Sequence, residues 1–518
     1  MASAETAVLS PLDQYMPGLY TTIFLVFESA HPARAVDRLR TGLHMVNQRL
    51  PYLRGRVFAT EANNPRDRGR LAIQWSLADN GVTMTEACID AGQDNAAALP
   101  GMCFRQLKRK GAPLHYFPDS LSPLPALVDL KTDVGVPALA VNYALLAGGV
   151  VLGVSVQHAV ADGSGMAELL RLFAHCTRSG GGGGDAAPLT LGPPPPPPPP
   201  PDPQEPLHRD RLLRLATTQG PREKLPFRTL LARHPEFGLL SDLVAAGGLP
   251  AWPPSPVGSS KVFAFDGAKL QAVKAALQAR EPSPAAERIT INTVLCAILW
   301  CCITRVRATR RDGAWSARRS KLGFAVNGRT RLPPGEVVSG PSFLGNVNIY
   351  GLAEAAVSEL EAAATAPIHV TALGPAVRAI ARAVRHITPE HIADVIELVD
   401  QAPDTQDIIP GWSGIHTADM TITSWANMSL YDFDFGTGLG KPAFVRVPEM
   451  ETDGLAIVLP RRRSVPETCR GACSAAAGVE GIEVVVAMYL EDMAALERDP
   501  VWASFLVCDG RSDSGPVD

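Results

Sequence analysis

Hydrophobic residues along the chain follow two periods, as in proteins that mix strands and helices. An apolar and β-branched run predicts a strand at residues 21–28, and apolar residues at helical spacing predict helices at 35–49 and 166–176. Residues 137–156 are uncharged over the length of a membrane span. However, Gly148 and Gly149 separate two β-branched stretches, which predicts a buried β-hairpin instead.

The second half of the chain has a similar mixture of elements, without a sequence repeat of fixed period. A strand is predicted at residues 261–265 and a helix at 268–279, and a long apolar helix at 291–306 follows. Further strands are predicted at 322–326, 346–350, 420–423, 456–459 and 483–488, before a last helix at 492–498. Alternation of strands and helices in both halves predicts an α/β protein.

Glycine and proline are enriched, and the excess is partly local. The 518 residues include 46 prolines and 45 glycines, with glycine at every position of 180–184 and proline at every position of 193–201. Glycine runs are flexible, and proline runs form extended polyproline II without a packing surface. We therefore expect a linker or exposed loop at about 178–206.

Charge and cysteine content narrow the class of protein. The formal net charge is −4, whereas nucleic-acid-binding domains are usually clearly basic. Nine cysteines are an odd and sparse set, and Cys469 and Cys473 have no second pair to complete a zinc site. Residues 1–11 lack the basic and apolar regions of a signal peptide. We expect a reduced, cytoplasmic protein without a metal, a membrane span or a nucleic-acid partner.

The stretch VSVQHAVADGSG at residues 154–165 carries the candidate chemistry. A β-branched strand ends at His158, Asp162 follows four residues later, and glycines precede a predicted helix. Histidine suits general-base catalysis near neutral pH, and a strand end beside a glycine turn can expose it to a cleft. The alternative is a packed histidine with Asp162 as the helix N-cap.

Three other chemistries fit these motifs poorly. A metal pair at His158 and Asp162 would need a third ligand, for which no matching cluster is found. The serine-hydrolase motif Gly-x-Ser-x-Gly fails at Gln157. Residues 436–441 resemble a phosphate loop only in part, because Pro442 replaces the expected serine or threonine.

The stretch HAVADG resembles the His-x-x-x-Asp-Gly signature of the BAHD acyltransferases, which use acyl-CoA. A second stretch, DFGTG at 434–438, is similar to the family's Asp-Phe-Gly-Trp-Gly, with Thr437 in place of tryptophan. Further matches occur in order at 9–14, 51–57, 297–300, 327–331, 343–346, 423–425 and 492–502. They cover essentially the whole chain outside the linker and its C-terminal flank. The stretches are similar to those of the fungal branch that includes trichothecene 3-O-acetyltransferases.

The resemblance implies a fold of two similar chloramphenicol-acetyltransferase-like α/β domains, with mixed sheets flanked by helices. A long crossover loop joins them, and CoA and the acceptor enter a channel between them from opposite faces. The expected boundaries are 1–177, 178–258 and 259–518, with the glycine- and proline-rich tract inside the crossover segment.

The resemblance also implies a role for individual residues. His158 would be the general base, and Asp162 would shape the site through an ion pair with Arg329. Thr423 and Trp425 would lie near the reacting centre, where an oxyanion needs a donor. Motif residues away from that centre would support the channel, namely Asp434, Gly436 and Gly438. Contacts to CoA would come from Ser259, Ser260 and Lys261, or from the basic stretches at 305–321 and 461–463.

The expected activity is O-acyl transfer, above all O-acetyl transfer, from acyl-CoA to a hydroxyl of a secondary metabolite. The expected enzyme is a monomer without a permanently bound cofactor, and it acts by direct transfer in a ternary complex. Alternatives are an N-acyltransferase of the same family and a non-catalytic protein that docks its proline run on a partner. A peptide-synthetase condensation domain fits less well, because Gln157 replaces the first histidine of its motif.

Overall fold

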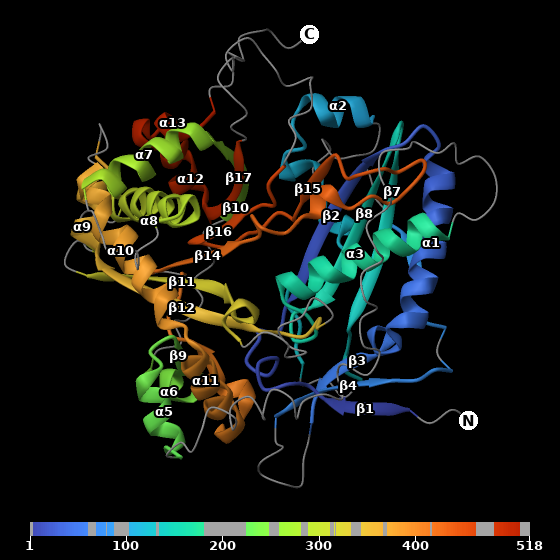
Figure 1. Ribbon diagram of the computed structural model, residues 1–518, viewed down its shortest axis with the longest axis horizontal. Helices are drawn as coiled ribbons and strands as arrows, with labels where there is room; N and C mark the ends of the chain where they lie inside the picture. The colour runs from blue at the N-terminus through green and yellow to red at the C-terminus, as the bar shows by residue number, and fades with distance from the viewer. Residues whose placement is uncertain are drawn as a thin grey trace.

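The computed structural model describes residues 4–60, 69–78, 80–87, 103–130, 134–180, 224–247, 258–280, 289–310, 315, 318–332, 343–365, 370–414, 417–462 and 481–507. Two large sheets organise these residues (Figure 1). The predicted linker at 178–206 lies outside the described residues, except for its first three positions. Helix α3 ends at Ser179, inside the range expected for that linker.

The first sheet is built mainly from the N-terminal half. Its five strands have the order β15-β2-β8-β7-β5. Their bounds are Phe444–Arg446, Tyr20–Glu28, Gly149–Gln157, Leu139–Leu146 and Met84–Glu86. Helices α1 (Pro32–Arg49) and α3 (Gly163–Ser179) pack against each other beside this sheet (Figure 1). The expected strand and both expected helices of this half are confirmed.

The uncharged stretch at 137–156 forms the predicted hairpin of β7 and β8. Leu146 pairs with Gly149, and Gly148 takes a φ of +82° at the turn, a conformation that favours glycine. Every residue of β8 is buried, which explains its continuous run of apolar and small side chains. His158 is the first residue after the carboxyl end of this strand.

The second sheet has six strands in the order β10-β17-β16-β14-β11-β12. Their bounds are Gly258–Phe265, Ile482–Tyr489, Leu455–Val458, Met420–Ser424, Arg319–Asn327 and Asn348–Ala356. Strand β14 runs parallel to β11 and β16, and the other pairs are antiparallel. The sheet is therefore mixed, as expected.

Helices α7 (Gly267–Arg280), α9 (Val357–Ala363), α10 (Val370–His386) and α12 (Leu490–Glu497) pack around α8 (Ile291–Thr309). By length and composition, α8 meets the criteria for a membrane span, the one helix in the described ranges that does. However, 83% of its apolar window is buried inside the protein, as in a core helix. Helix α12 corresponds to the helix predicted at 492–498 as the last of the chain. A further helix, α13 (Pro500–Phe505), follows it, so the prediction that it is the last helix is wrong.

Smaller elements complete the fold below the two sheets in Figure 1. A four-stranded sheet contains β1, β4, β3 and β6, with bounds Glu5–Val8, Leu71–Trp75, Arg56–Ala59 and Val136–Pro137. Strands β9 (Phe237–Leu239) and β13 (Ile408–Pro410) pair beside α5 (Phe227–Arg233), α6 (Leu240–Ala245) and α11 (Pro389–Gln401). Helix α2 (Phe104–Arg109) lies near the opposite end of the first sheet.

The C-terminal half contributes to the first sheet through β15, which pairs with β2. Arg446 of β15 is fully buried and donates to both carboxylate oxygens of Glu483 on β17, at 3.0 and 2.9 Å. Burial lowers the pKa of Arg446, but the charge of Glu483 outweighs this and raises it. This ion pair holds the two sheets together. The domain boundaries at 177 and 259 stay a prediction.

Candidate active site

His158 follows the last residue of β8, and its backbone is held on both sides. Its N–H donates to the carbonyl of Leu19 at 2.9 Å, and its carbonyl accepts from Asn346 Nδ2 at 2.8 Å. The side chain is partly exposed, but Nδ1 is buried and has no hydrogen-bond partner of normal geometry among the described residues. Nε2 is therefore the nitrogen that can meet a ligand.

Burial lowers the pKa of His158 below the ordinary value of a histidine. Its own backbone carbonyl, the charge of Asp162 and the side chain of Asn346 raise it in part. The net effect favours the neutral imidazole, which is the form that accepts a proton.

Asp162 is buried at the N-terminus of α3, and both of its carboxylate oxygens are occupied. Oδ1 accepts from the backbone of Gly165 at 2.9 Å, so Asp162 is the N-cap of the helix. Oδ2 accepts from Arg329 Nη1 at 2.7 Å and from the backbone of Val347 at 2.9 Å. Asp162 thus caps the helix and also makes the ion pair that the resemblance implies.

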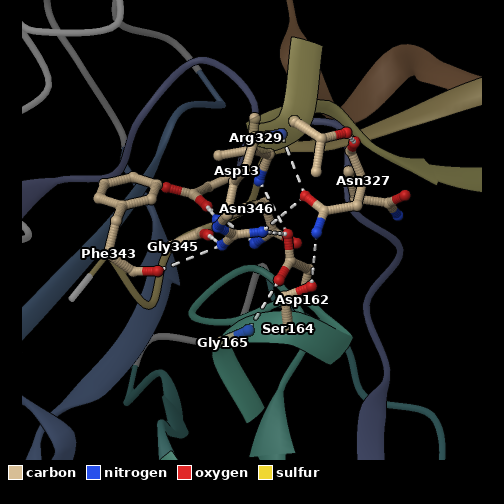
Figure 2. A network of polar contacts seen from close by, with 12 residues as sticks. Asp13, Asp162, Ser164, Gly165, Asn327, Arg329, Phe343, Gly345 and Asn346 are labelled. Atoms are coloured by element: carbon tan, nitrogen blue, oxygen red, sulfur yellow. Dashed lines mark hydrogen bonds and ion pairs between the residues drawn. The ribbon is translucent and has the colours of Figure 1, made fainter. Parts of the chain in front are cut away.

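Arg329 lies in the turn Gly328–Arg331 after β11 and connects Asp162 to the segment before β12. Its Nη2 donates to the carbonyls of Phe343 and Gly345 at 3.2 and 2.5 Å. Figure 2 shows this guanidinium between the carboxylate of Asp162 and the two carbonyls. The ion pair is 7% and 6% exposed at its two side chains, so it fixes the 343–347 segment against α3 from inside the protein.

Asp13 and Asn346 extend the same network to His158 and were not predicted as site residues. Asp13 Oδ1 accepts from the backbone and from the side chain of Asn346, both at 2.8 Å, and Oδ2 accepts from the backbone of Ser10 at 2.8 Å. Burial raises the pKa of Asp13 to about 6, although these donors lower it in part. Through Asn346, this carboxylate positions the carbonyl of His158.

Gly165 is required by close packing where α3 meets the segment before β12. A Cβ at Gly165 would overlap the backbone oxygen of Leu344, which cannot move without disturbing the Arg329 contacts. We expect Gly165→Ala to destabilise the fold by about 1–3 kcal/mol, measured by denaturant unfolding.

Gly163→Ala is the matched control, because a Cβ there would meet the flexible end of the Met428 side chain rather than backbone. We expect it to cost less than Gly165→Ala. Equal losses of stability would contradict the packing role of Gly165.

Trp425 lies beside Gly163, the residue that follows Asp162, whereas Thr423 lies on strand β14. A Cβ on Gly163 would lie 3.6 Å from Trp425 Nε1, and Trp425 is buried. Thr423 on β14 pairs with Ile457 on β16, and the side chain of Thr423 is partly exposed. Their part in binding an oxyanion stays a prediction.

The DFGTG stretch lies at the other end of α3 from Asp162. Phe435 packs edge-on against Phe27 and Phe173, and a Cβ on Gly436 would touch Arg178. Arg178 is about 24 Å along the helix from Asp162, at roughly 1.5 Å per residue. This separation agrees with a supporting role for the stretch.

Within that stretch, Asp434 Oδ1 accepts from the backbone of Gly436 at 2.9 Å. Gly436 and Gly438 have φ values of +86° and +88°, so each uses a conformation that favours glycine. Thr437 is exposed. The position where the family carries tryptophan therefore lies at the surface of this turn.

Two of the three residues predicted to contact CoA already have side-chain partners within the chain. Ser260 is buried and accepts from the backbone of Met450 at 2.8 Å, and Lys261 pairs with Glu497 at 2.6 Å. Ser259 Oγ is buried without a partner in the described part of the chain. A role of Ser260 or Lys261 toward CoA would require these contacts to change.

Several basic residues of the stretch at 305–321 form ion pairs or hydrogen bonds within the protein. Arg307 is buried and pairs with Asp453, Arg310 pairs with Asp492, and Lys321 donates to the carbonyl of Gly411. Part of the stretch lies outside the described residues, as does Arg463. The side chain of Arg462 lies over the rings of Tyr431 and Phe444.

Cysteine nucleophiles are disfavoured in the described core. Burial raises the pKa of Cys296 and of Cys302 to about 12, so both remain thiols at neutral pH. No described serine or cysteine makes a side-chain hydrogen bond to His158, which favours a mechanism without a covalent enzyme intermediate.

Family models match both halves of the chain. Residues 19–176 match the trichothecene 3-O-acetyltransferase-like N-terminal domain, and residues 257–501 match the Transferase family. The trichothecene 8-O-acetyltransferase of Fusarium sporotrichioides is 31% identical, over 97% of this chain and 98% of that relative. The O-acetyltransferase ptmV of Penicillium ochrochloron is 25% identical, over 97% of both chains.

Solved structures have the same fold. Apo TRI101 of F. graminearum superimposes with a TM-score of 0.70 at 18% identity, covering 97% of this chain and 99% of that one. Vinorine synthase gives a TM-score of 0.52 at 18% identity and covers 98% of each chain. The two-domain fold that the motifs imply is thus confirmed.

Proposed function

Because the chain belongs to the Transferase family, with a trichothecene 3-O-acetyltransferase-like N-terminal domain, we propose that it is an acyl-CoA-dependent O-acyltransferase. The acyl group is acetyl, and the acceptor is a hydroxyl of a fungal secondary metabolite. Full-length similarity to a trichothecene 8-O-acetyltransferase and to another fungal O-acetyltransferase supports this choice. TRI101 of F. sporotrichioides has a similar fold, and its crystal structure was solved in complex with Coenzyme A and T-2.

The placement of His158 carries the proposal. The acceptor hydroxyl gives its proton to His158 Nε2 as its oxygen attacks the thioester carbonyl carbon. The tetrahedral oxyanion then collapses, the carbon–sulfur bond breaks, and the departing thiolate takes the proton back from the imidazolium. The products are the ester and free CoA, and the enzyme returns to its starting state.

The surrounding network supplies orientation rather than proton transfer. Both oxygens of Asp162 are already used by donors, and its partner Arg329 is directed to backbone carbonyls. Asn346 holds the backbone carbonyl of His158 and thereby fixes the backbone from which the ring projects. The indole N–H of Trp425, which lies beside Gly163, is the proposed donor to the oxyanion.

The proposal is tested by incubating the purified protein with acetyl-CoA and a panel of terpenoid, polyketide and alkaloid alcohols. Mass spectrometry should detect an acetyl ester of at least one alcohol, formed in equal amount with free CoA. Trichothecene alcohols should be tested first. Acetylation of amines alone would instead support an N-acyltransferase.

The pH dependence of kcat/KM should reveal a neutral base with a lowered pKa. The base must be deprotonated, so activity rises with pH through the pKa of His158 in the free enzyme. Because burial lowers this pKa, the acidic limb should lie below pH ~6.5, the ordinary value of a histidine.

Asp13 also titrates near this range, since its pKa is about 6. Asp13→Asn is therefore the control, because the asparagine oxygen still accepts from Asn346. The acidic limb should persist in this variant. Loss of the limb in Asp13→Asn would assign it to Asp13 instead of His158.

A further inference from the structure

A second group of chemically capable side chains lies outside the proposed active site. His234 follows α5, Glu236 precedes β9, and His391 lies in the first turn of α11. The three residues are only 3%, 4% and 7% exposed. They connect the segment that begins at residue 224 with helix α11 of the C-terminal half. The pairing of β9 with β13 connects the same two parts of the chain.

The three side chains converge on one carboxylate oxygen. His234 Nδ1 lies 2.8 Å from Glu236 Oε1, and His391 Nε2 lies 3.1 Å from the same atom. One ligand atom from each residue lies within 4.8 Å of the other two, the one such set found among the described residues. Zinc–ligand bonds of roughly 2.0–2.1 Å place the ligand atoms of a tetrahedral site about 3.3 Å apart. Small movements of the three side chains would therefore bring their ligand atoms to zinc-binding distances.

Hydrogen bonding within the cluster leaves ring nitrogens unsatisfied. Nε2 of His391 is buried and, despite its distance of 3.1 Å from Glu236, does not have hydrogen-bond geometry. Nε2 of His234 is also buried without a hydrogen-bond partner in the described part of the chain. Buried polar atoms without partners are costly and therefore call for an explanation.

The chemistry of the donor set suits a cation. One carboxylate oxygen lies between two imidazole rings, and a buried carboxylate is stabilised by a cation or by well-placed donors. A bound cation would pair with this carboxylate and accept the lone pair of a buried ring nitrogen that has no hydrogen-bond partner in the described residues.

The cluster adjoins a cavity of about 310 Å³ between β12, α10 and α11. Glu236, His386 and His391 line it, and the rings of His386 and His391 lie 5.0 Å apart. The cavity offers an entry path and room for a water molecule or a fourth ligand. Two histidines, one carboxylate and an open fourth position form a donor set that zinc binds in proteins.

We propose that His234, Glu236 and His391 form a binding site for one zinc ion. This site departs from the expectation of no metal, which rested on the cysteine pattern and on the spacing of His158 and Asp162. The ion would fasten the segment around β9 to α11 and so stabilise the C-terminal half. The inference is independent of the proposed acyltransferase activity.

The test is zinc binding by the full chain, measured by equilibrium dialysis after treatment with a chelator and removal of the chelator. We expect about one equivalent of zinc per chain, and a melting temperature raised by at least about 3 °C in its presence. Cobalt(II) should give the intense visible absorption of a tetrahedral site. Failure of the wild-type chain to bind zinc at micromolar concentrations would overturn the proposal without touching the acyltransferase assignment.

Variants locate the site once binding is established. Glu236→Gln and His391→Ala should each weaken zinc binding by more than about 100-fold, because each removes a ligand. His386→Ala is the matched control, since this exposed histidine lines the same cavity outside the three-ligand set. It should retain most of the affinity. Unchanged binding in a folded His391→Ala variant would also overturn the proposal.

Discussion

Asp162→Ala should destabilise the protein by about 3–5 kcal/mol, the usual cost of removing one partner from a buried ion pair. The substitution leaves Arg329 buried without its carboxylate and removes the N-cap of α3. It also leaves the backbone of Val347 without its acceptor. Denaturant unfolding of the purified variant measures the loss, and activity should fall with it because the 343–347 segment loses its anchor.

An exposed ion pair provides the matched comparison for Asp162. Lys261 and Glu497 lie 2.6 Å apart, with side chains 47% and 40% exposed. Lys261→Met should cost less than ~1 kcal/mol, as exposed pairs usually do. Stabilities of Asp162→Ala and Lys261→Met within error of each other would contradict the framework role of the buried pair.

His158→Ala should lower kcat by about 10²–10⁴-fold, the usual contribution of a positioned general base. The structure predicts that the fold survives this change. The two hydrogen bonds that hold residue 158 use its backbone N–H and carbonyl, which alanine keeps. Melting temperature and circular dichroism should therefore match those of the wild type, while the rate of ester formation falls.

His175→Ala is the control for a general effect of removing a histidine. His175 lies on α3, near the end of the helix opposite to Asp162, and is partly exposed. Its removal should leave turnover near the wild-type rate. Comparable losses in His158→Ala and His175→Ala would argue against a specific role for His158.

The elements that were predicted from sequence have strong local signals. The hairpin at 137–156 and α8 are long apolar stretches bounded by glycine or polar residues, and both formed as predicted. Helix α10 was missed, because Pro375 lies inside it and proline usually ends a helix. Burial of its apolar face, including Leu373, Val377 and Ile380, outweighs that local preference.

The site was predictable only where a motif marked it. His158, Asp162 and Arg329 lie in family-like stretches, and the structure brings Asp162 and Arg329 into contact. Asp13 and Asn346 also lie in such stretches, but their contact joins positions 333 residues apart, and neither has a local signal of its role.

The buried His234, Glu236 and His391 group was missed for the same reason. His234 and Glu236 are two residues apart, which alone indicates no site. Their third member lies more than 150 residues further along the chain, in another helix. Only the folded arrangement shows that the three ligand atoms converge.

Release of CoA from acetyl-CoA, followed with and without an acceptor alcohol, tests direct transfer by a base at His158 most directly. The wild-type enzyme should release CoA only when the alcohol is present, in equal amount with the ester, and its own mass should stay unchanged. His158→Ala should release neither product above about 1% of that rate. An acetylated wild-type protein formed without alcohol, or near-normal turnover by His158→Ala, would contradict this mechanism.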